Sequence, residues 1–139
     1  MAYDRADWHY GGDFPADLPT EAGATHIGLF LAWAIHRGLV GDFHRNESSD
    51  AVAAVTRRDM SGGQFLIQEC DEKFWEEDLS DEGNAFAREY YADGYFADYV
   101  ETLAEELPSI YHVADTWANF DRLAPVLDQR LQQWRARPQ

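Results

Sequence analysis

The sequence has a single cysteine, no long apolar run and few basic residues, and each shortage excludes a class of protein. Cys70 has no cysteine partner in the 139 residues, so an intramolecular disulfide is excluded. The longest apolar run, residues 27–35, has about half of the roughly 20 residues that a membrane-spanning helix needs. Residues 1–7 lack the basic start and apolar stretch of a signal peptide. We therefore expect a cytoplasmic protein that makes no contact with a membrane.

The motifs of known catalytic and metal sites are also missing. None of the five histidines follows a glutamate by three positions, and the sequence contains no His-Glu-x-x-His motif, calcium loop or phosphate-binding loop. No Gly-x-Ser-x-Gly nucleophile motif occurs. Cys70 has the acidic neighbours Glu69, Asp71 and Glu72, which raise the pKa of its thiol and make it a poor nucleophile. We therefore predict no catalytic residue, no metal ligand and no cofactor, and we interpret the protein as a non-enzyme.

Aromatic residues are plentiful, and they decide whether the chain folds. A net charge of −15 would by itself favour disorder. Five Trp, seven Tyr and eight Phe argue against this, because acidic disordered segments lack such residues. The length is typical of one domain, so we predict a single folded domain over residues 1–139.

Apolar periodicity and helix-start signals predict an all-α domain of six or seven helices. Residues 27–35 are apolar almost all round, which is typical of a buried helix, so we place residues 24–38 at the centre. Ser61 and Gln64 have the spacing of a capping box. No run alternates in the manner of a strand, and residues 1–19 are expected to be irregular and packed on the helices. The predicted helices are residues 20–38, 49–58, 61 to 74 or 75, 80 to a break at Gly94, 94–108, and 112–135, where Pro125 marks a kink or a new start.

The negative charge is concentrated in one segment. Residues 69–106 contain fourteen acidic and two basic residues, whereas the chain from Arg122 onward is rich in arginine. Such a surface repels nucleic acid and anionic membranes, and it attracts basic proteins at low salt. We therefore expect a basic protein as partner and exclude nucleic acid.

Residues 69–82 are the candidate partner-binding site, because they hold eight acids around two aromatic residues, Phe74 and Trp75. A solvated helix face is the simpler interpretation, but acids so close together repel one another, and a basic partner would relieve the repulsion. The predicted binding residues are Glu69, Asp71, Glu72, Trp75, Glu76, Glu77, Asp78, Asp81 and Glu82.

Several short runs, spread over nearly the whole chain, resemble a known family. They are DWHYGGDFP at 7–15, ATHIG at 24–28, FLAWA at 30–34, DEKF at 71–74, NAFA at 84–87 and YHVADTW at 111–117. The sequence is similar to a family of small, acidic, uncharacterised bacterial proteins that are often regarded as immunity proteins of interbacterial toxins, such as those of type VI secretion. The resemblance implies an all-helical fold and a bacterial source, and it brings no catalytic residue with it.

Three functions are compatible with the sequence. The leading hypothesis is an immunity or antitoxin-like protein that binds and neutralises a cognate toxin, expected to be a basic nuclease, through its acidic segment. The alternative is a small hydrolase that uses His26, His112 and carboxylates gathered by the fold. His112 and Asp115 are three positions apart and could bind a metal from one helix face, but such a pair is more often a helix cap and its neighbour. A third hypothesis is a ligand-binding regulatory domain in which the aromatic loop of residues 8–14 acts as a lid.

Overall fold

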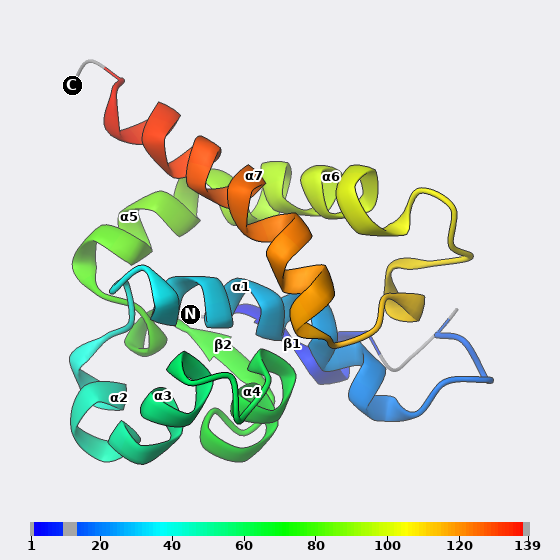
Figure 1. Cartoon of the computed structure of the whole chain (residues 1–139), viewed down its shortest axis with the longest axis horizontal. Coiled ribbons are helices and arrows are strands. Elements are labelled where there is room, and N and C mark those ends of the chain that lie inside the picture. Colours follow the sequence, from blue (N-terminus) through cyan, green and yellow to red (C-terminus); the bar gives the residue numbers. More distant parts are fainter. Residues whose placement is uncertain (1, 10–13, 138–139) are drawn as a thin grey trace.

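The computed structural model describes residues 2–9 and 14–137, and it places one helix at the centre of the molecule. Helix α1 (Thr25–His36) is buried along its whole length except at His36. Figure 1 shows α1 between a lower layer of α2, α3 and α4 and an upper layer of α5, α6 and α7. The sequence predicted this central helix, and the reason is the one given: a helix without a polar face is stable only when protein surrounds it.

The remaining elements are short, apart from the last helix. Strand β1 (Ala2–Arg5) and a 3-10 turn (Ala6–Trp8) precede α1, and a second 3-10 turn (Thr20–Ala24) leads into it. The other elements are α2 (Asp42–Glu47), α3 (Ser49–Thr56), α4 (Gly62–Glu69), β2 (Lys73–Trp75), the 3-10 turn η3 (Glu76–Asp78), α5 (Asp81–Tyr90), π-helical turns at Tyr91–Tyr95 and Val100–Ala104 on either side of α6 (Phe96–Tyr99), a 3-10 turn (Ile110–His112) and α7 (Trp117–Arg135).

Helices α1 and α4 touch through their backbones, and glycine makes this possible. A Cβ atom added to Gly28 would lie 2.2 Å from the backbone nitrogen of Gly63, and one added to Gly62 would lie 1.8 Å from the carbonyl oxygen of Gly28. Any side chain at these two positions would force the helices apart. The start of α4 is the predicted capping box, because the Ser61 hydroxyl accepts from the Gln64 amide while the Gln64 side chain accepts from the Ser61 amide.

The helix predicted from residue 61 to 74 or 75 is too long. The helix ends at Glu69. Asp71 and Glu72 then adopt positive φ angles of 53° and 61°, which are incompatible with a right-handed α-helix. The chain turns back and forms β2, which pairs antiparallel with β1 and brings Arg5 opposite Lys73. The prediction that the chain has no strand is therefore wrong in this small sheet. Three residues are too few to show a periodicity of two.

Other boundaries also differ from the predictions. Residues 42–47, which lie between the predicted helices 20–38 and 49–58, form α2. Gly94 does not break the chain's helical course, because the backbone continues from α5 through a π-helical turn into α6. Pro125 lies inside α7, which begins at Trp117 behind the Thr116 cap and not at residue 112.

The all-α prediction is confirmed, since helices form most of the molecule and the sheet has only two strands. Within residues 2–9 and 14–137, no helix combines the length and the apolarity that crossing a membrane would demand. The N-terminal segment, which was expected to pack on the helices, does so through Ala6 and Asp4, which are buried, whereas Trp8 of the same segment is 59% exposed. Residues 10–13 of the aromatic loop lie outside the described residues, so its predicted role as a lid stays a prediction.

Candidate functional site

One buried carboxylate organises the segment that we predicted to bind a partner. Asp78 is only 2% exposed. Its Oδ1 atom lies 2.6 Å from Nε2 of His44, and its Oδ2 atom accepts a 2.6 Å hydrogen bond from the Trp75 amide. The backbone carbonyl of the same residue accepts from the Gly41 amide. Asp78 therefore holds β2 and the start of α2 together from the inside. The prediction that Asp78 itself binds the partner is corrected, because a buried side chain cannot reach one.

The other groups around Asp78 complete a closed polar cluster. His44 is fully buried, and its Nδ1 atom lies 3.2 Å from the Ser48 hydroxyl. The sulfur of Cys70 lies 3.6 Å from Nε2 of His44. Burial, followed by the charge of Asp78, raises the pKa of the Cys70 thiol far above its usual range. Cys70 is thus a buried, protonated thiol, as an inert structural cysteine would be.

Two exposed aromatic side chains belong to the elements that this cluster joins. Trp75 of β2 is 36% exposed, and Phe43, near the start of α2, is 45% exposed. Asp42, Glu76 and Glu77 are exposed beside them. The backbones of these two segments meet closely, because a Cβ atom on Gly41 would lie 2.7 Å from the Glu77 carbonyl oxygen. We call the surface formed by Asp42, Phe43, Trp75, Glu76 and Glu77 the acidic aromatic face.

The remaining predicted binding residues do not share one environment. Asp71 is exposed and lies 3.4 Å from the amino group of Lys73, and Asp81 is exposed at the start of α5. Glu69 and Glu72 are half-buried. Glu82 forms a two-pronged ion pair with Arg135 of α7. Phe74, the second aromatic residue of the candidate site, is fully buried against Tyr3 and Tyr91, so it cannot contact a partner.

Arginines near the C-terminal end of the chain pair with three acids of the acidic segment. In addition to the Glu82 pair, Arg130 binds Asp98 at 2.9 Å, and Arg137 lies 3.2 Å from Glu89. The arginine-rich end of the chain therefore compensates part of the acidic segment within the molecule. The acidic aromatic face lies on the first half of that segment, away from these arginines.

A second polar cluster, which the sequence did not predict, lies under the N-terminal segment. Asp4 of β1 is buried, with Oδ1 2.8 Å from Nε2 of His9 and Oδ2 3.1 Å from Nε2 of His26. The same carboxylate accepts a hydrogen bond from the Tyr91 hydroxyl at 2.9 Å. The hydroxyl of Tyr111 lies 2.6 Å from the other ring nitrogen of His9. We call Asp4, His9 and His26 the N-terminal triad.

Electrostatics keep the carboxylate of the triad ionised. Burial alone would raise the pKa of Asp4, but the hydrogen bonds from His26 and His9 outweigh it and hold the pKa well below its ordinary value. Burial lowers the pKa of His26, and its contact with Asp4 opposes this only in part. The triad therefore combines one carboxylate with a neutral buried imidazole. No local spacing in the sequence reveals the triad, since Asp4 and His26 are 22 positions apart.

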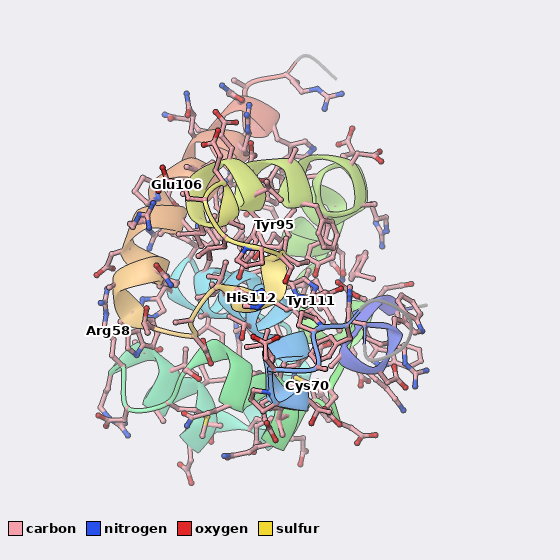
Figure 2. All side chains as sticks on the ribbon, turned by 90° about the vertical axis from the view of Figure 1, so that its right-hand side faces the viewer. Arg58, Cys70, Tyr95, Glu106, Tyr111 and His112 are labelled. Carbon is pink, nitrogen blue, oxygen red and sulfur yellow. The ribbon has the colours of Figure 1, made fainter. Side chains whose placement is uncertain are left out.

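A shallow hollow of about 490 Å³ adjoins this region and contains His112 of the hydrolase hypothesis together with a carboxylate, Asp115. His112 and Asp115 both line it, together with Thr25 and Tyr111. Figure 2 looks onto this face and shows Tyr111 and His112 at its centre. His26 does not line the hollow; it is buried behind Tyr111, with the two rings 6.1 Å apart. The fold thus gathers part of the predicted set and leaves His26 outside.

The partners of His112 form a chain of hydroxyl, imidazole and carboxylate. Its Nδ1 atom lies 2.8 Å from the Ser109 hydroxyl, and its Nε2 atom lies 3.3 Å from an exposed carboxylate oxygen of Asp17. The predicted pairing of His112 with Asp115 does not occur, because Asp115 accepts from the Ser61 hydroxyl at 2.6 Å. Burial raises the pKa of Asp115. The Ser109 hydroxyl also caps the following turn by accepting from the Tyr111 amide.

Comparison with known proteins gives one match. Residues 2–113 match a family model whose description is Domain of unknown function (DUF7832). This range covers well over half of the chain and includes both polar clusters. No curated protein and no solved structure matches the chain.

Proposed function

The chain belongs to the family described as a domain of unknown function (DUF7832), and from this premise we propose that it is a binding protein that neutralises a basic bacterial toxin. The observation that carries the proposal is the acidic aromatic face, where Trp75 and Phe43 are exposed beside Glu76 and Glu77. The resemblance of the sequence to immunity proteins implies an effector of interbacterial competition as the toxin, and the acidic segment favours a basic, nuclease-type toxin among such effectors. Such a protein acts in the cytoplasm, where the toxin would reach its target.

The chemistry of the face suits a cationic protein surface. Exposed aromatic side chains provide contact area that is removed from water on binding, and tryptophan is among the residues that most often dominate binding energy. The surrounding carboxylates would steer a basic partner to the face and repel nucleic acid, the substrate that a nuclease toxin binds. The face would therefore occupy the basic surface with which such a toxin holds its substrate.

The support beneath the face favours binding over a merely solvated surface. Asp78 fixes the Trp75 backbone and the His44 ring from inside, and the His44 ring contacts Phe43 with ring centres 5.2 Å apart. Side chains that are held in place before binding lose less conformational freedom when the partner arrives. A face built only for solubility would have no need of this rigid arrangement.

The test begins with the partner itself. We would co-express the chain with the product of the neighbouring open reading frame, purify the complex through a tag on one protein, and measure affinity by calorimetry. Trp75→Ala is expected to weaken binding by about 2 kcal/mol or more, as truncation of an interfacial tryptophan does. Trp8→Ala is the matched control, because Trp8 is still more exposed and lies outside the face.

Two results would contradict the proposal. The first is a neighbouring gene product with no toxin activity, combined with no basic protein that co-purifies. The second is a complex in which Trp8→Ala weakens binding as much as Trp75→Ala, because affinity would then not depend on the acidic aromatic face.

A hydrolase is the second candidate, since Ser109, His112 and Asp17 are hydrogen bonded in series at the edge of the hollow. This order of groups can activate a serine hydroxyl. Two facts weigh against it: the Ser109 hydroxyl is used as a turn cap, and Ser109 is not among the residues that line the hollow. Turnover of activated esters by the purified protein, abolished in Ser109→Ala, would favour the hydrolase over the binding protein.

A further inference from the structure

The N-terminal triad brings together three side chains that metal ions favour as ligands. Asp4 comes from β1, His9 follows the first 3-10 turn, and His26 belongs to α1. One donor atom from each of the three lies within 4.8 Å of the other two. Two imidazoles and one carboxylate are the protein ligands of many catalytic zinc sites, which leave a fourth position for water or another ligand.

The distances fit a small divalent ion. Asp4 oxygens lie 2.8 Å and 3.1 Å from the facing nitrogens of His9 and His26. Ligands bound at about 2.0–2.2 Å in a tetrahedron lie roughly 3.3–3.5 Å from one another, so an ion would widen these two carboxylate–imidazole distances by only a few tenths of an ångström. The charge also fits, because a single carboxylate and two neutral imidazoles leave a dication partly neutralised.

Neighbouring groups hold two of the three donors, Asp4 and His9, in place. The Arg5 amide and the Tyr91 hydroxyl donate to the two oxygens of Asp4. The Tyr111 hydroxyl contacts Nδ1 of His9, the nitrogen that faces away from Asp4. In metal sites the second nitrogen of a ligating histidine almost always has such a partner, which fixes the ring and its tautomer.

His26 presents one ring nitrogen to the triad from the interior of the molecule. Its side chain is 1% exposed, its Nε2 atom faces Asp4, and its Nδ1 atom has no hydrogen-bond partner among the described residues. A buried imidazole with one unpaired nitrogen is costly. Such a buried, incompletely paired polar group is typical of a functional or ion-binding site rather than of ordinary packing.

We propose that Asp4, His9 and His26 bind one divalent transition-metal ion of the zinc class. The ion fixes the N-terminal segment to α1, and its open position is on the side of His9, whose side chain is 16% exposed while those of its partners are almost fully buried. This inference is independent of the proposed toxin binding, since the triad does not share a residue with the acidic aromatic face.

The chain contains a competing group of ligands, and the experiment must separate the two. His44, Cys70 and Asp78 also place one donor atom each within 4.8 Å. That group includes a thiol, whereas the triad contains only nitrogen and oxygen donors. Cobalt(II) distinguishes them, because a thiolate ligand adds an intense charge-transfer absorption that nitrogen and oxygen ligands do not give.

We would titrate the metal-free full chain with Zn²⁺ by calorimetry and with Co²⁺ by absorption spectroscopy, with Mg²⁺ in excess to occupy exposed carboxylates. The expected result is one equivalent of Zn²⁺ and a Co²⁺ spectrum without thiolate absorption. Tyr111→Phe removes one hydroxyl from beside His9 and is expected to weaken Zn²⁺ binding about 10–100-fold. His9→Gln is expected to weaken it at least as much. His112→Gln and Cys70→Ser are the matched controls and are expected to bind Zn²⁺ as the unaltered chain does.

Three outcomes would overturn the proposal. The first is no Zn²⁺ uptake once Mg²⁺ is in excess. The second is uptake that Tyr111→Phe and His9→Gln leave unchanged. The third is a Co²⁺ spectrum with thiolate absorption that Cys70→Ser abolishes, which would place the ion at His44. Tyr111→Phe keeps the test decisive if His9→Gln does not fold, because Tyr111 loses only a hydroxyl.

Discussion

Oδ1 of Asp78 lies 2.6 Å from Nε2 of His44, and both side chains are buried. The two residues are 34 positions apart, and their contact joins α2 to the 3-10 turn η3. Since the second oxygen of Asp78 accepts from the Trp75 amide, one carboxylate sets the positions of both sides of the acidic aromatic face. Stability and the proposed binding surface therefore depend on the same side chain.

Replacing Asp78 by asparagine is expected to destabilise the fold markedly. The asparagine side chain keeps one acceptor oxygen, but its NH2 group replaces the oxygen that faces either His44 or the Trp75 amide. At least one of these two buried hydrogen bonds to a carboxylate is therefore lost. Such bonds contribute about 1.5–3 kcal/mol each, and we expect a loss of about 3 kcal/mol in the free energy of unfolding, measured with urea. Asp59→Asn is the control, because Asp59 pairs with Arg57 on an exposed surface. A change above about 0.5 kcal/mol there would show that the assay responds to any lost carboxylate.

The contact between α1 and α4 predicts a second large effect. In Gly28→Ala the new methyl group would lie 2.2 Å from the Gly63 nitrogen, which forces the two backbones apart. Overpacking of this kind typically costs about 1–3 kcal/mol, and contact with a backbone rather than a flexible side chain places Gly28→Ala at the upper end or beyond.

Gly38→Ala is the comparison for this substitution. Gly38 has a φ of +71° and no atom within 4 Å of an added Cβ, so it reports the conformational cost alone. That cost is about 1–2 kcal/mol. Equal losses in the two variants, measured by thermal or urea unfolding, would contradict the direct backbone contact of the two helices.

The histidine at the end of α1 predicts a dependence of stability on pH. Burial lowers the pKa of His36, and the nearby Arg58 and Arg37 lower it further, while the Val55 carbonyl and Asp121 oppose them. Between the lowered folded pKa and the unfolded value of about 6.5, the unfolded chain binds the proton and the folded chain does not. The contribution of His36 to the free energy of unfolding is therefore complete above the unfolded pKa of about 6.5. It is lost as the pH falls from there through the lowered pKa of the folded chain.

His36→Gln isolates this contribution, because glutamine can still donate to the Val55 carbonyl but does not titrate. We expect the free energy of unfolding to fall less between pH 7.5 and pH 5.5 in the variant than in the unaltered chain. Urea unfolding at the two pH values measures the difference. An equal or steeper fall in His36→Gln would contradict the lowered pKa.

The parts of this structure that local signals determine were predictable. The apolar run of α1 and the Ser61–Gln64 cap each involve neighbours in sequence, and both are as predicted. The strand β2 was not predictable, because it is three residues long and exists only through its pairing with Ala2–Arg5. Asp78 looked like one more surface acid, since nothing within the acidic run distinguishes the carboxylate that meets His44.

The same limit applies to the N-terminal triad. Asp4 and His26 are 22 positions apart, and the hydroxyl beside His9 belongs to Tyr111, so a search for local metal spacings could not find them. An available signal was the position of His26, which directly precedes the apolar run 27–35 and falls within residues 24–38, predicted to be the central helix. An imidazole in such a helix needs a polar partner, and this requirement could have directed attention to it.

The proposed binding face makes a prediction about salt. Association of a basic partner with the face should slow as ionic strength rises, because exposed charges are screened beyond a Debye length of about 8 Å at physiological salt. Glu76→Gln combined with Glu77→Gln removes two charges from the face, so it should lower the association rate at low salt and flatten its dependence on salt. Stopped-flow or surface-based kinetics with the purified partner at several salt concentrations gives both quantities.

Glu105→Gln combined with Glu106→Gln is the matched control for that pair. Both glutamates are exposed and adjacent, so the net charge changes equally, but they follow the π-helical turn Val100–Ala104 and lie outside the face. If the partner approaches through the acidic aromatic face, the control retains most of the salt dependence. Equal effects of the two double substitutions would mean that the partner responds to the total charge of the molecule, and the face would then have no special role in steering.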